Sequence, residues 1–262
     1  MKNELITIGP ITVYGYGLMI AIGVIVAYVV AEYRAKKKNL NNEQIFPLII
    51  WCLIGGMLGA KFLYYITQIK EIVADPKILL KVSDGFVVYG GIIGGILAGF
   101  VFCKKEKLNF LKYFDLVMPS IALAQGFGRI GCFLAGCCYG KETTSRFGIV
   151  FNESTQAPNG VQLIPTQLIS CGLDFINFLV LIVLAKRVKV DGQVAGFYLI
   201  FYSVGRFILE YFRGDLIRGS VGSLSTSQFI SILLFVIGCG IVLVREYSSR
   251  NIARNEHNSL TK

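Results

Sequence analysis

The sequence predicts an all-α integral membrane protein with seven transmembrane helices. The mean hydropathy is +0.63 and 54% of the residues are hydrophobic. The apolar residues gather in runs near the length of about 20 residues that crosses a bilayer. A spanning segment must pair its own backbone polar groups, so each run is expected to be a helix. The expected spans are residues 13–33, 46–66, 86–102, 116–134, 166–184, 194–212 and 227–244.

The placement of lysine and arginine predicts how these spans are oriented. With seven spans, alternate connections and tails fall on two sides of the membrane, and one side carries fifteen basic residues against eight on the other. The side richer in lysine and arginine faces the cytoplasm in multi-pass proteins. We therefore expect the N-terminus outside and the C-terminus in the cytoplasm.

The net charge of +10 does not indicate nucleic-acid binding. The excess basic residues lie next to membrane ends, where they set topology and meet anionic lipid. We expect residues 1–245 to form a single transmembrane domain and residues 246–262 to form a basic, disordered cytoplasmic tail. The first apolar run has one lysine before it, basic charge after it and no small-residue cleavage site, so we expect it to remain uncleaved.

The seven cysteines, an odd number, do not indicate a disulfide framework. Four of them lie in or beside apolar spans and are expected to pack as small hydrophobic groups, namely Cys52, Cys103, Cys171 and Cys239. The other three, Cys132, Cys137 and Cys138, gather within residues 128–140. They lack CxxC spacing and a clear fourth ligand, and the only histidine is His257, so we expect neither a metal nor a cofactor.

Ionisable residues inside the spans are the main candidates for function, because placing them in lipid is costly. Arg129 lies in a glycine-rich stretch, and the sixth span carries Tyr202, Arg206, Glu210 and Arg213 at intervals of four, four and three. This spacing puts the four side chains on one helical face. Two interpretations stay open. The face holds an internal Arg206–Glu210 ion pair, or together with Arg129 it receives an anionic lipid head group, which the guanidinium fork suits.

Three further charged residues have structural interpretations. We expect Asp115 to cap or lie at the start of a helix, Asp174 to pair with another helix, and Lys61 to extend toward the interface. Glycines also cluster at small intervals, which predicts close helix packing. Gly90 and Gly91 are additionally candidates for close approach to a lipid head group.

Six motifs, in order along nearly the whole chain, resemble the prolipoprotein diacylglyceryl transferase family. They are YGLM at 16–19, GFVVYGGIIGG at 85–95, GRIGCFLAGCCYG at 128–140, PTQL at 165–168, YSVGRFILEYFR at 202–213 and GSLSTSQ at 222–228. One such match is weak evidence, whereas six in order on a seven-span chain are specific.

The resemblance implies a multi-pass enzyme of the bacterial cytoplasmic (inner) membrane that performs the first step of lipoprotein maturation. Such an enzyme moves the diacylglyceryl group of phosphatidylglycerol to the lipobox cysteine of a prolipoprotein, and it releases glycerol phosphate. The implied partners are phosphatidylglycerol, prolipoproteins and the bilayer, with no metal or soluble cofactor. A thiolate attacks a carbon that carries a phosphate leaving group, so the site needs a proton acceptor and fixed positive charge.

The resemblance also implies the site residues. The catalytic candidates are Arg129, Arg206, Glu210 and Tyr89. The substrate-binding candidates are Arg129, Tyr16, Gly90, Gly91, Tyr202, Cys132 and Cys137. The two arginines stabilise the departing phosphate, and Glu210 either orients Arg206 or acts as the base.

Three positions depart from the commonest family pattern. Tyr89 stands where many members have histidine, Cys132 replaces an asparagine and Cys137 replaces a glutamate. Tyrosine is a poor base near neutral pH, so the identity of the base stays open, and the chain is expected to belong to a divergent, cysteine-bearing branch. The alternatives are a related lipid transferase with another acceptor, in which Cys137 or Cys138 is covalent or redox-active, and a non-catalytic protein that binds anionic lipid. Simple packing of the three cysteines also stays open.

Overall fold

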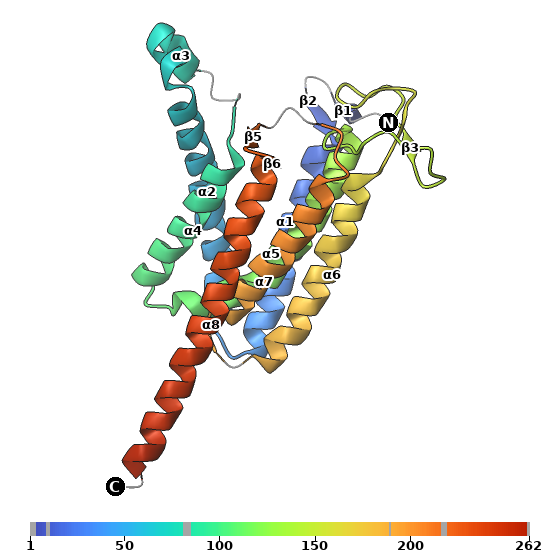
Figure 1. Ribbon diagram of the computed structural model, residues 1–262. Coiled ribbons are helices and arrows are strands. Elements are labelled where there is room, and N and C mark those ends of the chain that lie inside the picture. Colours follow the sequence, from blue (N-terminus) through green and yellow to red (C-terminus); the bar gives the residue numbers. More distant parts are fainter. Residues whose placement is uncertain (1–3, 9–10, 81–84, 189, 216–218, 261–262) are drawn as a thin grey trace. The chain divides into compact units, whose positions relative to one another are not determined.

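The computed structural model describes residues 4–8, 11–80, 85–188, 190–215 and 219–260. These residues are mostly helical (Figure 1). The chain divides into two compact units, one formed by Met1–Val30 with Phe114–Lys262 and the other by Ala31–Tyr113. We call them the site unit and the glycine unit and describe each by itself. The single domain expected over residues 1–245 stays a prediction.

The long helices follow the expected apolar runs. They are α1 (Gly15–Lys37), α2 (Ile45–Thr67), α4 (Val88–Lys105), α5 (Phe110–Ala135), α6 (Thr166–Arg187), α7 (Gln193–Glu210) and α8 (Thr226–Leu260). Short helical turns are η1 (Asn42–Gln44), α3 (Ile69–Ala74) and η2 (Pro76–Leu80). Three antiparallel pairs of strands complete the fold: β1 (Glu4–Ile8) with β2 (Ile11–Tyr14), β3 (Ile149–Val150) with β4 (Gln162–Leu163), and β5 (Ser220–Val221) with β6 (Leu224–Ser225).

Six of these helices, among the described residues, are long and apolar enough to cross a bilayer. The fold is therefore that of an all-α integral membrane protein. The six are α1, α2, α4, α5, α6 and α8. The sixth expected span forms a helix, α7, but its polar residues set it apart from the other six. Helix α8 does not end at Val244, where we expected the last span to end, but continues to Leu260.

In the glycine unit, α2 and α4 pack closely side by side (Figure 1). A Cβ atom added at Gly59 would collide with the Gly90 carbonyl oxygen and lie 2.9 Å from the Gly94 Cα atom. One added at Gly55 would lie 2.9 Å from the Gly94 carbonyl oxygen. The backbones approach one another because these positions carry no side chain, which is the usual basis of tight packing in lipid.

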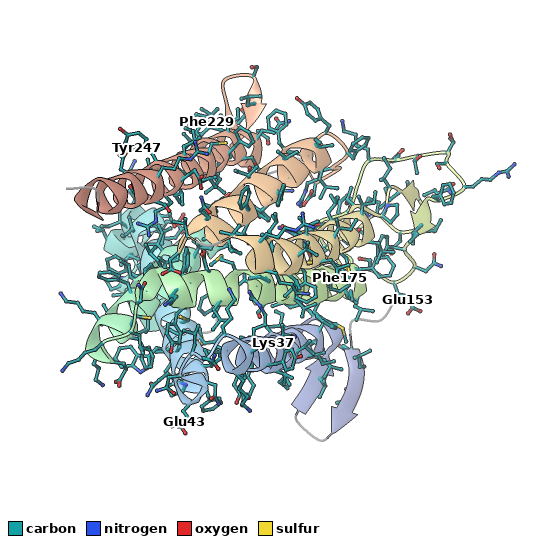
Figure 2. All side chains as sticks on the ribbon, turned by 90° about the horizontal axis from the view of Figure 1, so that it is seen from below. Lys37, Glu43, Glu153, Phe175, Phe229 and Tyr247 are labelled. Carbon is teal, nitrogen blue, oxygen red and sulfur yellow. The ribbon has the colours of Figure 1, made fainter. Side chains whose placement is uncertain are left out.

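In the site unit, α7 lies between α6 and α8 in contact with both. Gly196 of α7 and Gly238 of α8 face one another, since a Cβ atom added to either would lie about 3 Å from the carbonyl oxygen of the other. A buried apolar cluster joins α5, α6 and α7, and it includes Met118, Leu181 and Tyr198. Large apolar side chains such as Phe229 and Tyr247 point outward along α8 (Figure 2), as expected of a surface that faces lipid.

Asp115 of α5 caps the start of α7. Its Oδ2 atom accepts a hydrogen bond from the Gly192 amide at 2.7 Å, and its Oδ1 atom accepts one from the Ala195 amide at 2.9 Å. The first turn of a helix has amide groups without intrahelical partners, and a carboxylate is well suited to them. The capping interpretation of Asp115 is thus confirmed, with the cap supplied by a different helix.

Candidate functional site

The charged face of α7 is held by serine hydroxyls of the strand β6 and the first turn of α8. Arg206 Nη2 lies 2.8 Å from Glu210 Oε2 and donates to Ser227 Oγ at 2.8 Å. Ser225 Oγ donates to the other carboxylate oxygen, Glu210 Oε1, at 3.0 Å. Both charged side chains are about 10% exposed, so the pair is shielded from water. The expected Arg206–Glu210 ion pair is confirmed.

The start of α8 forms a capping box that fixes Ser225. The Ser225 amide donates to Gln228 Oε1 at 3.1 Å, and the Gln228 amide donates to Ser225 Oγ at 3.2 Å. This reciprocal pattern satisfies two amide groups at the helix start. The Ser225 hydroxyl therefore caps the start of α8 and also binds Glu210. In this way it couples the Arg206–Glu210 ion pair to the geometry of the β5–β6 turn.

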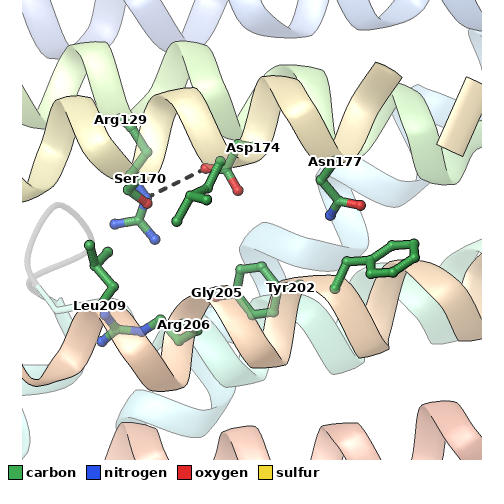
Figure 3. A pocket seen from close by; sticks show the side chains of 10 residues that line it. Arg129, Ser170, Asp174, Asn177, Tyr202, Gly205, Arg206 and Leu209 are labelled. Atoms are coloured by element: carbon green, nitrogen blue, oxygen red, sulfur yellow. Dashed lines mark ion pairs between the residues drawn. The ribbon is translucent and has the colours of Figure 1, made fainter. Parts of the chain in front are cut away.

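Arg129 and Arg206 line one cavity between α5, α6 and α7 (Figure 3). Its polar walls are Arg129, Ser170, Asp174, Asn177, Tyr202 and Arg206. Arg129 Nε lies 3.9 Å from Asp174 Oδ2, which confirms that Asp174 pairs with another helix. Arg129 reaches from α5 toward the helix that carries Arg206. Two guanidinium groups thus line one space, and each has a carboxylate partner, Asp174 for Arg129 and Glu210 for Arg206.

Several polar atoms around this cavity have no hydrogen-bond partner within the described residues. They are Arg206 Nη1, Asn177 Nδ2, Asn177 Oδ1 and Asp174 Oδ2, all of them buried. Buried polar atoms without partners are costly, so an unpaired guanidinium nitrogen here indicates a place for an acceptor. The cavity volume is about 20 Å³, which holds roughly one water molecule. A space of this size does not hold a phosphate group.

The segment after α5 brings Cys132, Cys137 and Cys138 together. Gly136, with φ +70°, ends the helix, and the Gly136 amide donates to the Phe133 carbonyl at 3.2 Å while the Cys137 amide donates to the Cys132 carbonyl at 3.1 Å. These two bonds are those of a Schellman motif. The chain thereby folds back over its last turn, and the three sulfur atoms lie within 4.8 Å of one another.

Arg213 follows α7 and lies beside this turn. It is 3% exposed and forms a two-pronged ion pair with Asp215, with Nη2 to Oδ2 at 2.6 Å and Nε to Oδ1 at 2.8 Å. Hydrogen bonds from the Cys132 and Cys137 thiols, together with the charge of Arg213, lower the pKa of Cys138 below its ordinary value.

The predicted site residues fall into three groups. Arg129, Tyr202 and Arg206 share the cavity, with Glu210 bound to Arg206. Tyr16 of α1 packs its ring over Gly131, 3.2 Å from a Cβ atom added there, and its hydroxyl is within electrostatic range of Arg129 and of Cys132, Cys137 and Cys138. The third group, Tyr89, Gly90 and Gly91, lies in the glycine unit.

Tyr89, Gly90 and Gly91 belong to the glycine unit, at the start of α4. Gly90 is buried against Gly59, which gives it a packing role. Gly91 is less crowded, since an added Cβ atom would lie 3.3 Å from the Gly56 carbonyl oxygen. The proposed contacts of these three residues with substrate stay predictions.

Sequence reasoning missed the serine and amide partners of the charged residues. Ser225, Ser227, Asn177 and Asp215 each contact or line the site, yet none was singled out. A usable signal was present for Asn177, a polar amide within an apolar span. For Ser225 and Ser227 the signal is the S-x-x-Q pattern of a capping box.

The site unit therefore combines helices of bilayer length with two arginines that line one small cavity, which is typical of a polytopic membrane protein that handles an anionic group. The sequence model of the prolipoprotein diacylglyceryl transferase family matches residues 3–244. The chain belongs to this family.

Three curated relatives cover nearly the whole chain. A phosphatidylglycerol–prolipoprotein diacylglyceryl transferase of Clostridium tetani is 48% identical over 91% of this chain and 95% of its own length. The second such enzyme of Clostridium perfringens is 46% identical over 95% of this chain and 98% of its own length. That of Finegoldia magna is 33% identical over 98% of this chain and its entire length.

Proposed function

We propose that the chain transfers the diacylglyceryl group of phosphatidylglycerol to the lipobox cysteine thiol of prolipoproteins in the bacterial cytoplasmic membrane. The single observation that carries the site assignment is that Arg129 and Arg206 face one buried cavity, where Arg206 Nη1 lacks a hydrogen-bond partner within the described residues. The names of the curated relatives support the reaction and both substrates.

The two arginines bind the phosphodiester of the lipid and stabilise its departure. The acceptor sulfur attacks the glycerol carbon next to the phosphate, the carbon–oxygen bond breaks, and its electron pair leaves with glycerol phosphate. Charge gathers on the phosphate in a site shielded from water, where preplaced guanidinium donors are most effective. Tyr202, one turn before Arg206 on the cavity wall, supplies a further hydroxyl for the head group.

Glu210 positions Arg206 rather than taking the proton of the thiol. Its Oε1 atom accepts a hydrogen bond from Ser225, and its Oε2 atom lies in the ion pair with Arg206. A carboxylate held in this way keeps the guanidinium plane fixed and leaves Arg206 Nη1 for the substrate. Tyr16 lies near Cys132, Cys137 and Cys138 and is placed to contact the acceptor prolipoprotein.

The proposed topology has seven spans, with α7 as the sixth in order along the chain. Helix α7 crosses the membrane as part of the bundle because α5, α6 and α8 shield its charged face. The N-terminus then lies outside and the C-terminus in the cytoplasm, in agreement with the basic residues in the last turns of α1, α4 and α6. Reporter fusions at both termini and after α6 test this arrangement, and an external C-terminus contradicts it.

The test of function is direct transfer in a purified system. The protein in detergent is mixed with a lipobox peptide and either phosphatidylglycerol or phosphatidylethanolamine of the same acyl chains. We expect mass spectrometry to show a diacylglyceryl adduct on the peptide cysteine, and glycerol phosphate release, with phosphatidylglycerol alone. Binding of phosphatidylglycerol without an adduct from folded protein would instead support a non-catalytic lipid-binding protein.

A further inference from the structure

The sulfur atoms of Cys132, Cys137 and Cys138 form a ready set of three metal ligands. They lie within 4.8 Å of one another, and each side chain is half-buried. Zn–S bonds of about 2.3 Å in a tetrahedral site place neighbouring sulfurs about 3.8 Å apart. Small side-chain rotations are enough to close the cluster on an ion. Within the described part of the chain, no histidine or carboxylate belongs to this group.

The backbone of the turn holds this arrangement. Cys138 has φ +59°, a conformation that non-glycine residues adopt uncommonly. The N-terminus of α6 fixes the turn from the other side: Gln167 Nε2 donates to the Cys137 carbonyl at 2.8 Å, and Thr166 Oγ1 donates to the Cys138 carbonyl at 2.8 Å. The ligand set is therefore preorganised, as metal sites require.

The surroundings of the cluster are not those of cysteines that merely pack. Arg213, which also forms the ion pair with Asp215, is buried and within hydrogen-bonding reach of Cys138. Its N–H groups are donors that a metal-bound thiolate accepts, whereas a sulfur that only packs needs no such donor.

We propose that Cys132, Cys137 and Cys138 bind one Zn²⁺ whose fourth coordination position receives the acceptor thiol of the prolipoprotein. This inference rests on the proposed transferase function and revises the expectation that the chain needs no metal. A site with three protein ligands and one open position is the arrangement of catalytic rather than structural zinc. With the ion bound, no protein side chain has to act as the general base, because a thiol coordinated to a metal is deprotonated.

The acceptor thiol binds the ion and releases its proton to water. Its sulfur then forms a bond to the terminal glycerol carbon of the lipid, the bond from that carbon to the phosphate oxygen breaks, and the electron pair leaves with glycerol phosphate, which gains the negative charge that the thiolate loses. The thioether is a weaker ligand than the thiolate, so the product leaves the ion.

The three cysteines lie close to Arg129, as a site that binds the acceptor thiol requires. Cys132 follows Arg129 by three residues on α5, and residues at this spacing share a helix face. Tyr16 is within electrostatic range of Arg129 and of all three cysteines. The sulfur that attacks and the phosphate that leaves are thus positioned by neighbouring parts of one helix.

The first experiment measures metal binding. The protein is purified with a tag free of histidine, and metal content is measured by mass spectrometry after equilibration with Zn²⁺. We expect one Zn²⁺ per chain, and Cys132→Ser, Cys137→Ser and Cys138→Ser each to weaken binding by more than about 100-fold, since even an outer hydrogen-bond partner of a ligand contributes about 10–100-fold. Cys239→Ser, a half-buried cysteine outside the cluster, serves as the matched control and is expected to bind normally.

The second experiment substitutes Co²⁺ and follows its visible spectrum as lipobox peptide is added. We expect a tetrahedral thiolate spectrum that changes with the peptide but not with the same peptide carrying serine in place of cysteine. An unchanged spectrum overturns the proposal that the acceptor binds the ion. A disulfide within the cluster and no bound metal overturns it in favour of a redox pair.

Activity separates the two proposals. Chelation followed by Zn²⁺ is expected to abolish and restore transfer. Full transfer by metal-free protein overturns the zinc site and leaves the transferase function intact. One Zn²⁺ per chain with a spectrum that responds to the peptide, but no transfer from phosphatidylglycerol, supports the zinc site and contradicts the proposed reaction.

Discussion

Helices α2 and α4 of the glycine unit and helices α7 and α8 of the site unit solve the same packing problem in different ways. The first pair meets backbone to backbone through Gly55, Gly59, Gly90 and Gly94. The second pair has one such contact, Gly196 with Gly238, and adds a buried network of charges and hydroxyls. In lipid, close packing alone is sufficient to hold helices together. The costly polar network of α7 and α8 therefore indicates function rather than assembly.

The largest effect that this comparison predicts is the loss of transfer activity in the Arg206→Ala variant. Removing one preplaced donor to a developing anion typically costs about 10²–10³ in rate, and transfer is expected to fall at least that far while expression and membrane insertion persist. Arg206→Lys keeps the charge but loses the fork, so we expect it to be nearly as inactive. Initial rates of adduct formation measure both.

The control for this variant is Arg206→Ala combined with Glu210→Ala. Removing one partner of a buried ion pair destabilises by about 3–5 kcal/mol, whereas removing both is far milder. We expect the double variant to recover thermal stability without recovering transfer. Turnover close to that of the unaltered protein in either variant contradicts a phosphate-binding role for Arg206.

The next largest effect is the destabilisation of the glycine unit by the Gly59→Leu substitution. The new side chain would meet the Gly90 carbonyl oxygen and the Gly94 Cα atom, and backbone atoms have little freedom to yield. Overpacking typically costs about 1–3 kcal/mol and sometimes more, so we expect a clear drop in the unfolding temperature in detergent. Gly95→Ala is the matched control, because its Cβ atom would lie 3.4 Å from the nearest atom. Equal stability of the two variants contradicts the close approach.

A smaller effect is expected from Asp115→Ala. The variant loses two hydrogen bonds to the start of α7, and loss of a helix cap costs about 0.5–2 kcal/mol. Asp115→Asn retains an acceptor and is expected to lose less. Thermal unfolding compares the unaltered protein, Asp115→Asn and Asp115→Ala. An unfolding temperature lower for Asp115→Asn than for Asp115→Ala argues against capping.

The smallest effect is expected from Ser225→Ala. The change removes the capping hydroxyl and one partner of Glu210, which we expect to cost about 1 kcal/mol in stability. Because Arg206 still holds Glu210, transfer is expected to fall only several-fold. Ser223→Ala, at an exposed position of the same turn, provides the control. A loss as large as that of Arg206→Ala would mean that Ser225 contacts the substrate.

The sequence anticipated those features that depend on periodicity and charge. Apolar runs located all seven long helices to within a few residues at most ends, and the four-residue spacing placed Arg206 beside Glu210. The convergence of Cys132 with Cys137 and Cys138 was not predictable in this way, because it depends on a left-handed turn at Gly136 and Cys138. The partners Ser225 and Asp215 were equally hidden, because short polar side chains in loops are common and their contacts are set by tertiary structure.

Helix α7 has a consequence for how the protein is made. Charged residues within a span are costly to insert, and α7 carries Arg206 and Glu210 in its last five residues. The serines that satisfy this pair belong to the next segment, from Ser225 to Ser227. During synthesis α7 therefore gains its stabilising contacts only after the start of α8 has emerged. We expect the two helices to enter the bilayer as one hairpin.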